Sequence, residues 1–235
     1  MEGNELFPVF IKLNTLHTLL VGAGPVGLEK LTALITNSPR AKITIVALKV
    51  LPEVSELANR SLNVVIYQKA FHEEDLDDID LVFAATNNDE LNEQIRTFAK
   101  KKKLLANFAD KPALCDFYLG SIVKKGDLKI GISTNGKSPT IAKRLKEILN
   151  ESLPEEINTS LQQMSKLRNR LEGDFTDKVI RLNQVTSILV DNEQNHPLAE
   201  RIVANIKAKI TVKYVMLSLG ILLTLVSLCF IFSLI

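Results

Sequence analysis

The stretch that decides the fold runs from residue 17 to residue 27 and reads HTLLVGAGPVG. The apolar run 17–22 ends at a glycine, as a buried parallel strand does. In the GxGxxG spacing that follows, Gly22 permits a tight turn, Gly24 lets the backbone approach a pyrophosphate, and Gly27 lets the next helix pack closely on the strand. The stretch therefore predicts a nucleotide-binding turn at a helix N-terminus, and the alternative is a purely structural glycine turn.

Outward from this stretch, strand and helix signals alternate as far as residue 108. Short apolar runs predict buried strands, and segments with apolar residues at helical spacing predict the helices between them. Such alternation favours a parallel sheet covered by helices through right-handed crossovers. The expected strands are 17–22, 41–47, 62–67, 80–86 and 104–108, and the expected helices are 25–36, 51–58 and 89–102.

Past residue 112 the pattern changes to a strand pair and then to helices. Strands over 117–123 and 128–133 surround a polar turn at 124–127. From residue 151 to about residue 209 the chain is polar, with helical spacing and no strand signal. Helices are expected over 138–149, around 161–171, over 179–190 and over 198–206. The fold class is thus α/β, with a Rossmann-type parallel-sheet domain over 1–113, a small α+β region over 114–150, a helical domain over 151–210 and a transmembrane helix over 211–235.

The last part of the chain is strongly apolar, and residues 214–235 include no charged side chain. A helix of ~20 apolar residues can span the bilayer core. Lys207, Lys209 and Lys213 precede the apolar run, and the positive-inside rule then places the preceding domain in the cytoplasm. We expect a single-pass membrane anchor, and the alternative is a buried hydrophobic C-terminal helix.

Composition argues against several classes of function. The net charge of +2 is mild and gives no nucleic-acid signal, because that assignment needs basic residues clustered on one face. Cys115 and Cys229 lie far apart, which supports neither a disulfide framework nor a structural zinc site. Cys115 is expected to be a small buried hydrophobic residue. No bound metal is expected, because His17, His72 and His196 share no ligand spacing.

One usual part of a dinucleotide site is missing. An Asp or Glu commonly ends the second strand and binds the adenosine ribose. Here the expected strand ends before Leu48 and Lys49, with no acidic residue. Either backbone groups bind the ribose of NAD, or Lys49 binds the 2′-phosphate of NADP. The residues therefore leave NAD and NADP both open at this point.

Polar residues follow the fourth and fifth expected strands. Ligands of open α/β sheets bind at the carboxyl ends of the strands, near the point where the strand order reverses. Thr86 and Asn87 are therefore expected to contact the nicotinamide half of a cofactor. Asp110 is a candidate general acid or base facing the same cleft, and the alternative is a solvated or helix-capping aspartate.

A third polar element, over 131–139, joins an expected strand to an expected helix. It offers hydroxyls, a flexible glycine and a cation, which suits the binding of carboxylate groups. The alternative is simply a capped helix start. The candidate substrate-binding residues are Ser133, Thr134, Asn135, Lys137 and Ser138.

Taken in order, these pieces resemble the precorrin-2 dehydrogenase family, which includes the dehydrogenase and chelatase module of siroheme synthases. The similarity spans roughly residues 5–150 and continues weakly into the helical part. No single piece is decisive, but all of them in the right order are hard to obtain by chance. The matching stretches are FPVF (7–10), LVGAGPV (20–26), AATNN (84–88), NFAD (107–110), LCDF (114–117) and ISTNGKSP (132–139).

The resemblance implies NAD⁺-dependent oxidation of precorrin-2 to sirohydrochlorin and, as in some members, insertion of Fe²⁺ to give siroheme. It implies a homodimer whose contact lies in the region after the sheet, over 114–150. The aspartate implicated in both activities falls on Asp110. NAD is favoured because the family commonly lacks the ribose-binding acid. Cofactor contacts are implied at Pro25, Val26, Leu48 and Lys49.

The chain also departs from the family pattern. Gly27 replaces a more usual alanine, and Thr134 stands where some relatives carry a serine that can be phosphorylated. A second hypothesis is a membrane-tethered module that senses NAD(H). Such a module would need the glycine turn and the apolar tail, but neither Asp110 nor the loop 131–139.

Overall fold

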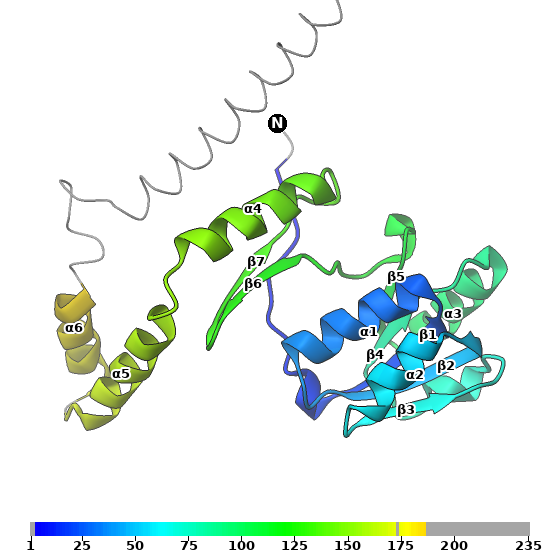
Figure 1. Ribbon diagram of the computed structural model, residues 1–235, viewed down its shortest axis with the longest axis horizontal. Helices are drawn as coiled ribbons and strands as arrows, with labels where there is room; N and C mark the ends of the chain where they lie inside the picture. Colours follow the sequence, from blue (N-terminus) through cyan, green and yellow to red (C-terminus); the bar gives the residue numbers. More distant parts are fainter. Residues whose placement is uncertain (1–2, 173, 187–235) are drawn as a thin grey trace, which may run out of the picture. The chain divides into compact units, whose positions relative to one another are not determined.

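The computed structural model describes residues 3–172 and 174–186, which form two units (Figure 1). Residues Glu5–Leu119 form one, called the sheet unit here. The described residues of 1–4 and 120–235 form the other, called the hairpin unit. The sheet unit contains a five-stranded sheet, and the hairpin unit contains a two-stranded one.

The expected Rossmann-type parallel sheet is confirmed in the sheet unit. Every pairing in it is parallel, and the strand order is β3-β2-β1-β4-β5. The order therefore reverses between β1 and β4, where open α/β sheets bind their ligands. The strands are β1 (His17–Ala23), β2 (Lys42–Val50), β3 (Val64–Tyr67), β4 (Leu81–Ala84) and β5 (Leu105–Phe108).

Helices cover both faces of this sheet because successive strand residues point to opposite sides. Leu20 and Phe83 are buried with α1 and α2 on one face, and Leu19 and Val82 are buried with α3 on the other. These helices are α1 (Pro25–Asn37), α2 (Pro52–Asn59) and α3 (Asp89–Lys101). The unit also contains three short 3-10 helices: η1 (Leu13–Thr15) before β1, η2 (Glu73–Leu76) between β3 and β4, and η3 (Pro112–Leu114) after β5.

The second strand is longer than the sequence predicted. It runs to Val50 rather than ending at residue 47, and its register with β1 shifts. Val21 pairs with Val46, whereas Ala23 pairs with Val50. Residues 47–49 thus form a bulge within β2, opposite a single residue of β1. The predicted strand was too short because the polar Lys49 interrupts the apolar run, although the strand continues through it to Val50.

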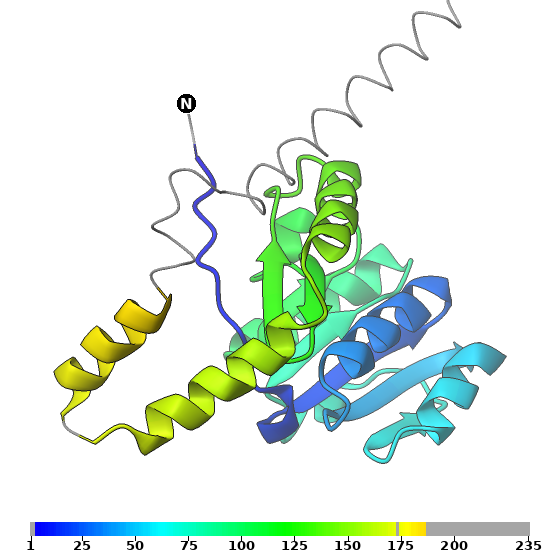
Figure 2. The ribbon, with the colours of Figure 1, turned by 60° about the vertical axis from the view of Figure 1, so that its left-hand side comes forward.

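In the hairpin unit, an antiparallel hairpin packs against a helix. The strands are β6 (Ser121–Lys125) and β7 (Leu128–Ile132), so the first begins later than the predicted 117. Gly126 adopts φ +58, which lets two residues, rather than the predicted four, make the turn. Figure 2 shows α4 (Pro139–Ser152) running beside the hairpin.

The helices after α4 belong to the same unit as the hairpin. They are α5 (Ile157–Arg170) and α6 (Phe175–Thr186). The backbone N–H of Asp127 donates to Oδ1 of Asn158 at 2.8 Å, and Lys125 pairs with Glu155. These contacts bind the hairpin turn to the start of α5, in the region expected to be a separate helical domain.

Within the described residues, no helix is both long and apolar enough to cross a membrane. The predicted transmembrane helix over 211–235 and the predicted helix over 198–206 lie outside the described residues.

Candidate functional site

The glycine turn joins β1 to α1 at the carboxyl edge of the sheet. Gly22 has φ +102, a conformation that strains any side chain. A Cβ at this position would also lie 2.4 Å from the carbonyl oxygen of Ala85, just past β4. A Cβ on Gly27 would lie 2.3 Å from the carbonyl oxygen of Gly22. Both glycines therefore permit close approaches of backbone to backbone.

Gly24 differs from the other two glycines of the turn. A Cβ there would meet no described atom within 4 Å, and its φ of −84 is open to any residue. Gly24 is the N-cap of α1, none of the described side chains caps that helix, and Pro25 begins it. Open space before an uncapped helix N-terminus fits the pyrophosphate of a dinucleotide. The contacts implied at Pro25 and Val26 lie in this first helical turn.

The bulge of β2 lies next to this turn, because the N–H of Leu51 donates to the carbonyl of Ala23 at 3.1 Å. The bulge exposes Leu48 and Lys49 where a ribose-binding acid commonly stands. Nε2 of Gln68 donates to the carbonyl of Leu48 at 3.2 Å and so ties the bulge to the end of β3. Gln68 was not among the predicted site residues, although its place directly after an expected strand was a signal.

A buried amide fixes the turn after β4. Asn92 on α3 is 2% exposed. The Thr86 hydroxyl donates to Oδ1 of Asn92 at 2.7 Å, and Nδ2 of Asn92 donates to the carbonyl of Thr86 at 3.2 Å. The Thr86 hydroxyl therefore points into the protein, whereas Asn87 is exposed. The signal for Asn92, which the analysis missed, is a polar residue on the apolar face of a helix.

Asp110 lies on the turn that directly follows β5. It is exposed and has φ +57, a left-handed conformation that Asp tolerates better than most residues. The N–H of Ala109 donates to the carbonyl of Ala84 at 2.9 Å, which continues the β4–β5 ladder up to this turn. Asp110 thus stands at the same edge of the sheet as Gly22 and Thr86, past the ends of three adjacent strands.

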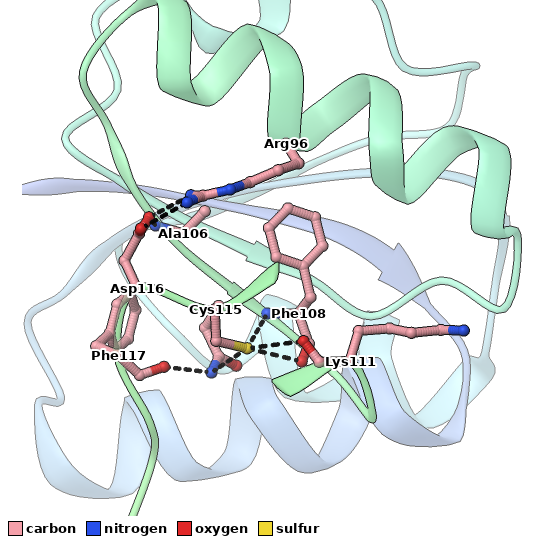
Figure 3. Close-up of polar contacts among 8 residues, drawn as sticks. Arg96, Ala106, Phe108, Lys111, Cys115, Asp116 and Phe117 are labelled. Carbon is pink, nitrogen blue, oxygen red and sulfur yellow. Dashed lines mark hydrogen bonds and ion pairs between the residues drawn. The ribbon is translucent and has the colours of Figure 1, made fainter. Parts of the chain in front are cut away.

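The outer side of β5 is covered by the segment 115–117 (Figure 3). The ring of Phe117 packs edge-on against Phe83, with centroids 5.4 Å apart. Cys115 is only half-buried, and its sulfur hydrogen-bonds to the backbone of Phe108, so it is not the plain buried hydrophobic residue that was expected. These contacts explain why the sheet unit extends to Leu119, past the expected boundary at residue 113.

The loop 131–139 belongs to the hairpin unit and forms a capped helix start. Ser138 caps α4 by accepting from the N–H of Ile141 at 3.2 Å. The hydroxyls of Ser133 and Thr134 accept from N–H groups of the same loop, those of Asn135 and Ser138, each at 3.2 Å. Asn135 and Lys137 are exposed. Binding of substrate carboxylates by this loop stays a prediction.

No group of three or more His, Cys, Asp or Glu side chains within the described residues could hold a metal ion. The ring of His17 lies between the carbonyl of Asp78 and the hydroxyl of Thr44, and burial, followed by Lys42, lowers the pKa of this histidine. His72 caps η2, and His196 lies outside the described residues.

Comparison with known proteins gives matches over most of the chain. A family model described as "Putative NAD(P)-binding" matches residues 9–121, and another described as "Sirohaem biosynthesis protein central" matches residues 125–152. The siroheme synthase of Saccharophagus degradans is 30% identical over 198 residues, covering 84% of this chain and 42% of that protein. The siroheme synthase of Pseudoalteromonas translucida is 33% identical over 171 residues, covering 73% of this chain and 36% of that protein.

The chain therefore spans less than half the length of these curated relatives. Among solved structures, one titled "SirC, precorrin-2 dehydrogenase" is similar with a TM-score of 0.61 and 24% sequence identity. The similarity covers 86% of this chain and 100% of that one, which shows a shared fold.

Proposed function

We propose that this chain oxidises precorrin-2 to sirohydrochlorin with NAD⁺. The proposal is supported by its similarity to siroheme synthases and by the match of an NAD(P)-binding model followed by a model of the central part of sirohaem biosynthesis proteins. The observation that carries the proposal is the place of Asp110. Its exposed carboxylate stands on a left-handed turn, one strand away from the strand end that borders the glycine turn. The solved precorrin-2 dehydrogenase shares this fold over its whole length.

The proposed reaction removes a hydride from a ring carbon of precorrin-2 and a proton from the same macrocycle. When bound, NAD⁺ supplies the acceptor for the hydride. The glycine turn would hold the pyrophosphate at the N-terminus of α1, and the turn at Thr86, fixed by Asn92, would border the nicotinamide half. Asp110 accepts the proton as general base, so that sirohydrochlorin, NADH and a proton are the products.

Asp110→Asn is the direct test of this assignment. Asn adopts the left-handed conformation about as readily as Asp, so the turn is kept while the base is lost. We expect kcat for NADH formation to fall by ~10²–10⁴-fold. The KM for NAD⁺ should change little, because the glycine turn is untouched. The assay follows NADH after precorrin-2 is added to the detergent-solubilised full chain.

The controls separate this enzyme from a module that only senses NAD(H). A wild-type chain that binds NADH but forms none from precorrin-2 would contradict the dehydrogenase and favour the sensor. Full activity of Asp110→Asn would remove Asp110 from catalysis while leaving the dehydrogenase standing. Arg60→Gln, which breaks only the exposed ion pair with Glu56 on α2, is the matched control and should leave kcat unchanged.

We also propose insertion of Fe²⁺ into sirohydrochlorin as a second activity of the same site. The metal is a substrate here, and a base must take the pyrrole protons that it displaces. Asp110 would serve, so Asp110→Asn should lose both activities. Siroheme formation from sirohydrochlorin and Fe²⁺, measured without NAD⁺, tests this step separately from the dehydrogenase.

Two further proposals concern assembly and location. The chain is proposed to form a homodimer and to be anchored by residues 211–235, with the enzyme on the cytoplasmic side. The anchor is supported by the absence of charge over 214–235 and by the lysines before it. Recovery of the full chain in the soluble fraction after a high-salt wash would contradict the anchor. Sedimentation equilibrium in detergent tests the dimer.

A further inference from the structure

Asp116 joins the outer edge of β5 to helix α3 (Figure 3). Its backbone N–H donates to the carbonyl of Ala106 at 2.9 Å, and its Oδ2 accepts from the N–H of Ala106 at 3.0 Å. The guanidinium of Arg96 on α3 donates to both carboxylate oxygens, at 2.5 Å and 2.8 Å. The Asp116 carboxylate therefore accepts a hydrogen bond from the backbone of the edge strand β5 and also holds α3 through a bidentate ion pair with Arg96.

The electrostatics keep this pair in place. The hydrogen bond from Arg96 lowers the pKa of Asp116, against an opposing effect of burial, and the N–H of Ala106 lowers it further. The side chains of Arg96 and Asp116 are 23% and 24% exposed, so water screens the pair less than it screens a surface ion pair. Asp116 is thus ionised, and the pair is intact, throughout the neutral range.

Cys115 closes the loop that carries Asp110. Its sulfur accepts from the N–H of Phe108 at 3.2 Å, and its S–H has the carbonyls of Phe108 at 3.2 Å and Lys111 at 3.4 Å within reach. Burial raises the pKa of Cys115, which keeps the thiol protonated and able to donate. The two ends of the loop 109–114 are thereby held together, and the loop itself includes the left-handed Asp110.

The loop is fixed at other points as well. The N–H of Ala109 binds the carbonyl of Ala84, and Nζ of Lys111 pairs with the carboxylate of Asp89 at 2.9 Å. Asp110 itself is exposed between these points. A left-handed non-glycine residue is strained and persists only where its surroundings over-determine it. The contacts of Cys115 and Asp116 are such surroundings.

We propose that Arg96, Cys115 and Asp116 are positioning residues that hold the Asp110 carboxylate in its reactive place at the end of β5. The inference rests on the proposed function, in which Asp110 is the base. None of the three side chains contacts the glycine turn in the described hydrogen bonds and ion pairs. Loosening them should therefore affect the chemical step and spare cofactor binding.

The first test splits kcat from KM. Arg96→Lys keeps the charge but loses the two-pronged geometry. We expect kcat for precorrin-2 oxidation to fall ~10-fold, because displacement of a reacting group by about 1 Å can cost up to ~10²-fold. The KM for NAD⁺ and the Kd for NADH should stay within ~2-fold of wild type, since the glycine turn keeps its own contacts. Lys101→Gln breaks the ion pair between α3 and Glu73 and is the control, with kcat unchanged.

The second test asks whether the loss acts through Asp110. Residues that act as a unit give non-additive effects. Arg96→Lys should therefore cost nothing further in an Asp110→Asn background. Losses that multiply in the double variant, or a parallel change of kcat, KM and Tm in the single variant, would mean a merely structural role and would overturn the proposal.

Cys115 supplies an independent route, should Arg96→Lys fail to fold. Cys115→Ser keeps a donor and an acceptor and should retain kcat within ~3-fold, whereas Cys115→Ala should lose ~10-fold, again without a change in NADH affinity. Equal activity of the two variants and the wild type would overturn the role of Cys115. Absence of NADH formation by the wild type would instead overturn the proposed function, and the positioning role with it.

Discussion

Gly24 and Gly27 stand three residues apart in one turn, yet a methyl group would act differently at each. Gly24→Ala adds a Cβ into open space, so we expect an unchanged or slightly higher Tm. The same Cβ occupies the surface predicted for the pyrophosphate, so the Kd for NADH should rise ~10-fold or more. Thermal melts and fluorescence titration with NADH measure the two effects. Tight NADH binding by Gly24→Ala would mean that the pyrophosphate does not lie against Gly24, and the glycine turn would then be purely structural.

Gly27→Ala is the counterpart, and it should act on stability. Its Cβ would lie 2.3 Å from the carbonyl oxygen of Gly22, which is backbone and cannot turn away. We expect a loss of about 1–3 kcal/mol in the free energy of unfolding, as for other overpacked sites. Urea denaturation checks this value. Wild-type stability of the variant would mean that α1 shifts at little cost.

The carboxylate of Asp116 links stability to pH. Its pKa is lowered in the folded protein, mainly by Arg96, so its contribution is fully present above the unfolded pKa of about 3.9. That contribution is lost as the pH falls through the folded pKa. The difference in free energy of unfolding between wild type and Asp116→Asn should therefore be largest near neutrality and shrink below about pH 4. Urea denaturation at several pH values measures it, and a difference that grows in acid would contradict the prediction.

At the scale of elements, the bulge in β2 bears on the choice of cofactor. Leu48 and Lys49 are exposed beside the glycine turn, where no acid selects for a ribose. These two residues leave NAD⁺ and NADP⁺ both open, and because the proposed reaction uses NAD⁺, we expect kcat/KM to be higher with NAD⁺ than with NADP⁺. Lys49→Gln should change the KM for NAD⁺ by less than ~2-fold, because an exposed lysine that meets no phosphate contributes little. A preference for NADP⁺ that disappears in Lys49→Gln would instead identify Lys49 as the partner of a 2′-phosphate.

The turn after β4 depends on Asn92. Asn92→Ala removes both hydrogen bonds to Thr86 from a buried site and should cost about 1–3 kcal/mol of unfolding free energy. Asn88→Ala removes only the cap of α3, an exposed bond to the N–H of Leu91, and should cost about 1 kcal/mol. Urea denaturation compares the two variants. Equal losses of unfolding free energy would mean that the buried hydrogen bonds of Asn92 stabilise the protein no more than an exposed helix cap does.

How much the sequence could predict depends on the range of the contacts. The roles of Gly22 and Gly27 follow from local spacing, and the structure has both close approaches. The bulge of β2 could not be predicted, because it exists only in the register with β1. The pair of Arg96 with Asp116 spans 20 residues of sequence, so no local pattern indicated it. Asp110 could be located from its strand, but its left-handed φ depends on contacts from elsewhere.

At the scale of the whole molecule, the sheet unit extends to Leu119 rather than to residue 113. A fragment of residues 5–119 should therefore unfold cooperatively in urea. A fragment of residues 5–113 should not unfold cooperatively. It lacks the side chains that accept hydrogen bonds from the backbone N–H groups of Ala106 and Phe108, and it lacks the Phe117 ring that packs on Phe83. Cooperative unfolding of the shorter fragment with equal stability would contradict this account.

The covered flank of β5 also has a consequence for self-association. With the outward backbone of Ala106 and Phe108 already bonded, an incoming peptide finds no partners there. In the described part of the chain, no strand pairs with the outer flank of β3, where Val65 and Tyr67 are about half exposed. Edge-to-edge pairing of this sheet would therefore join β3 to β3 of a second copy and stop at two molecules, because the described sheet has no second open flank left to extend a ribbon.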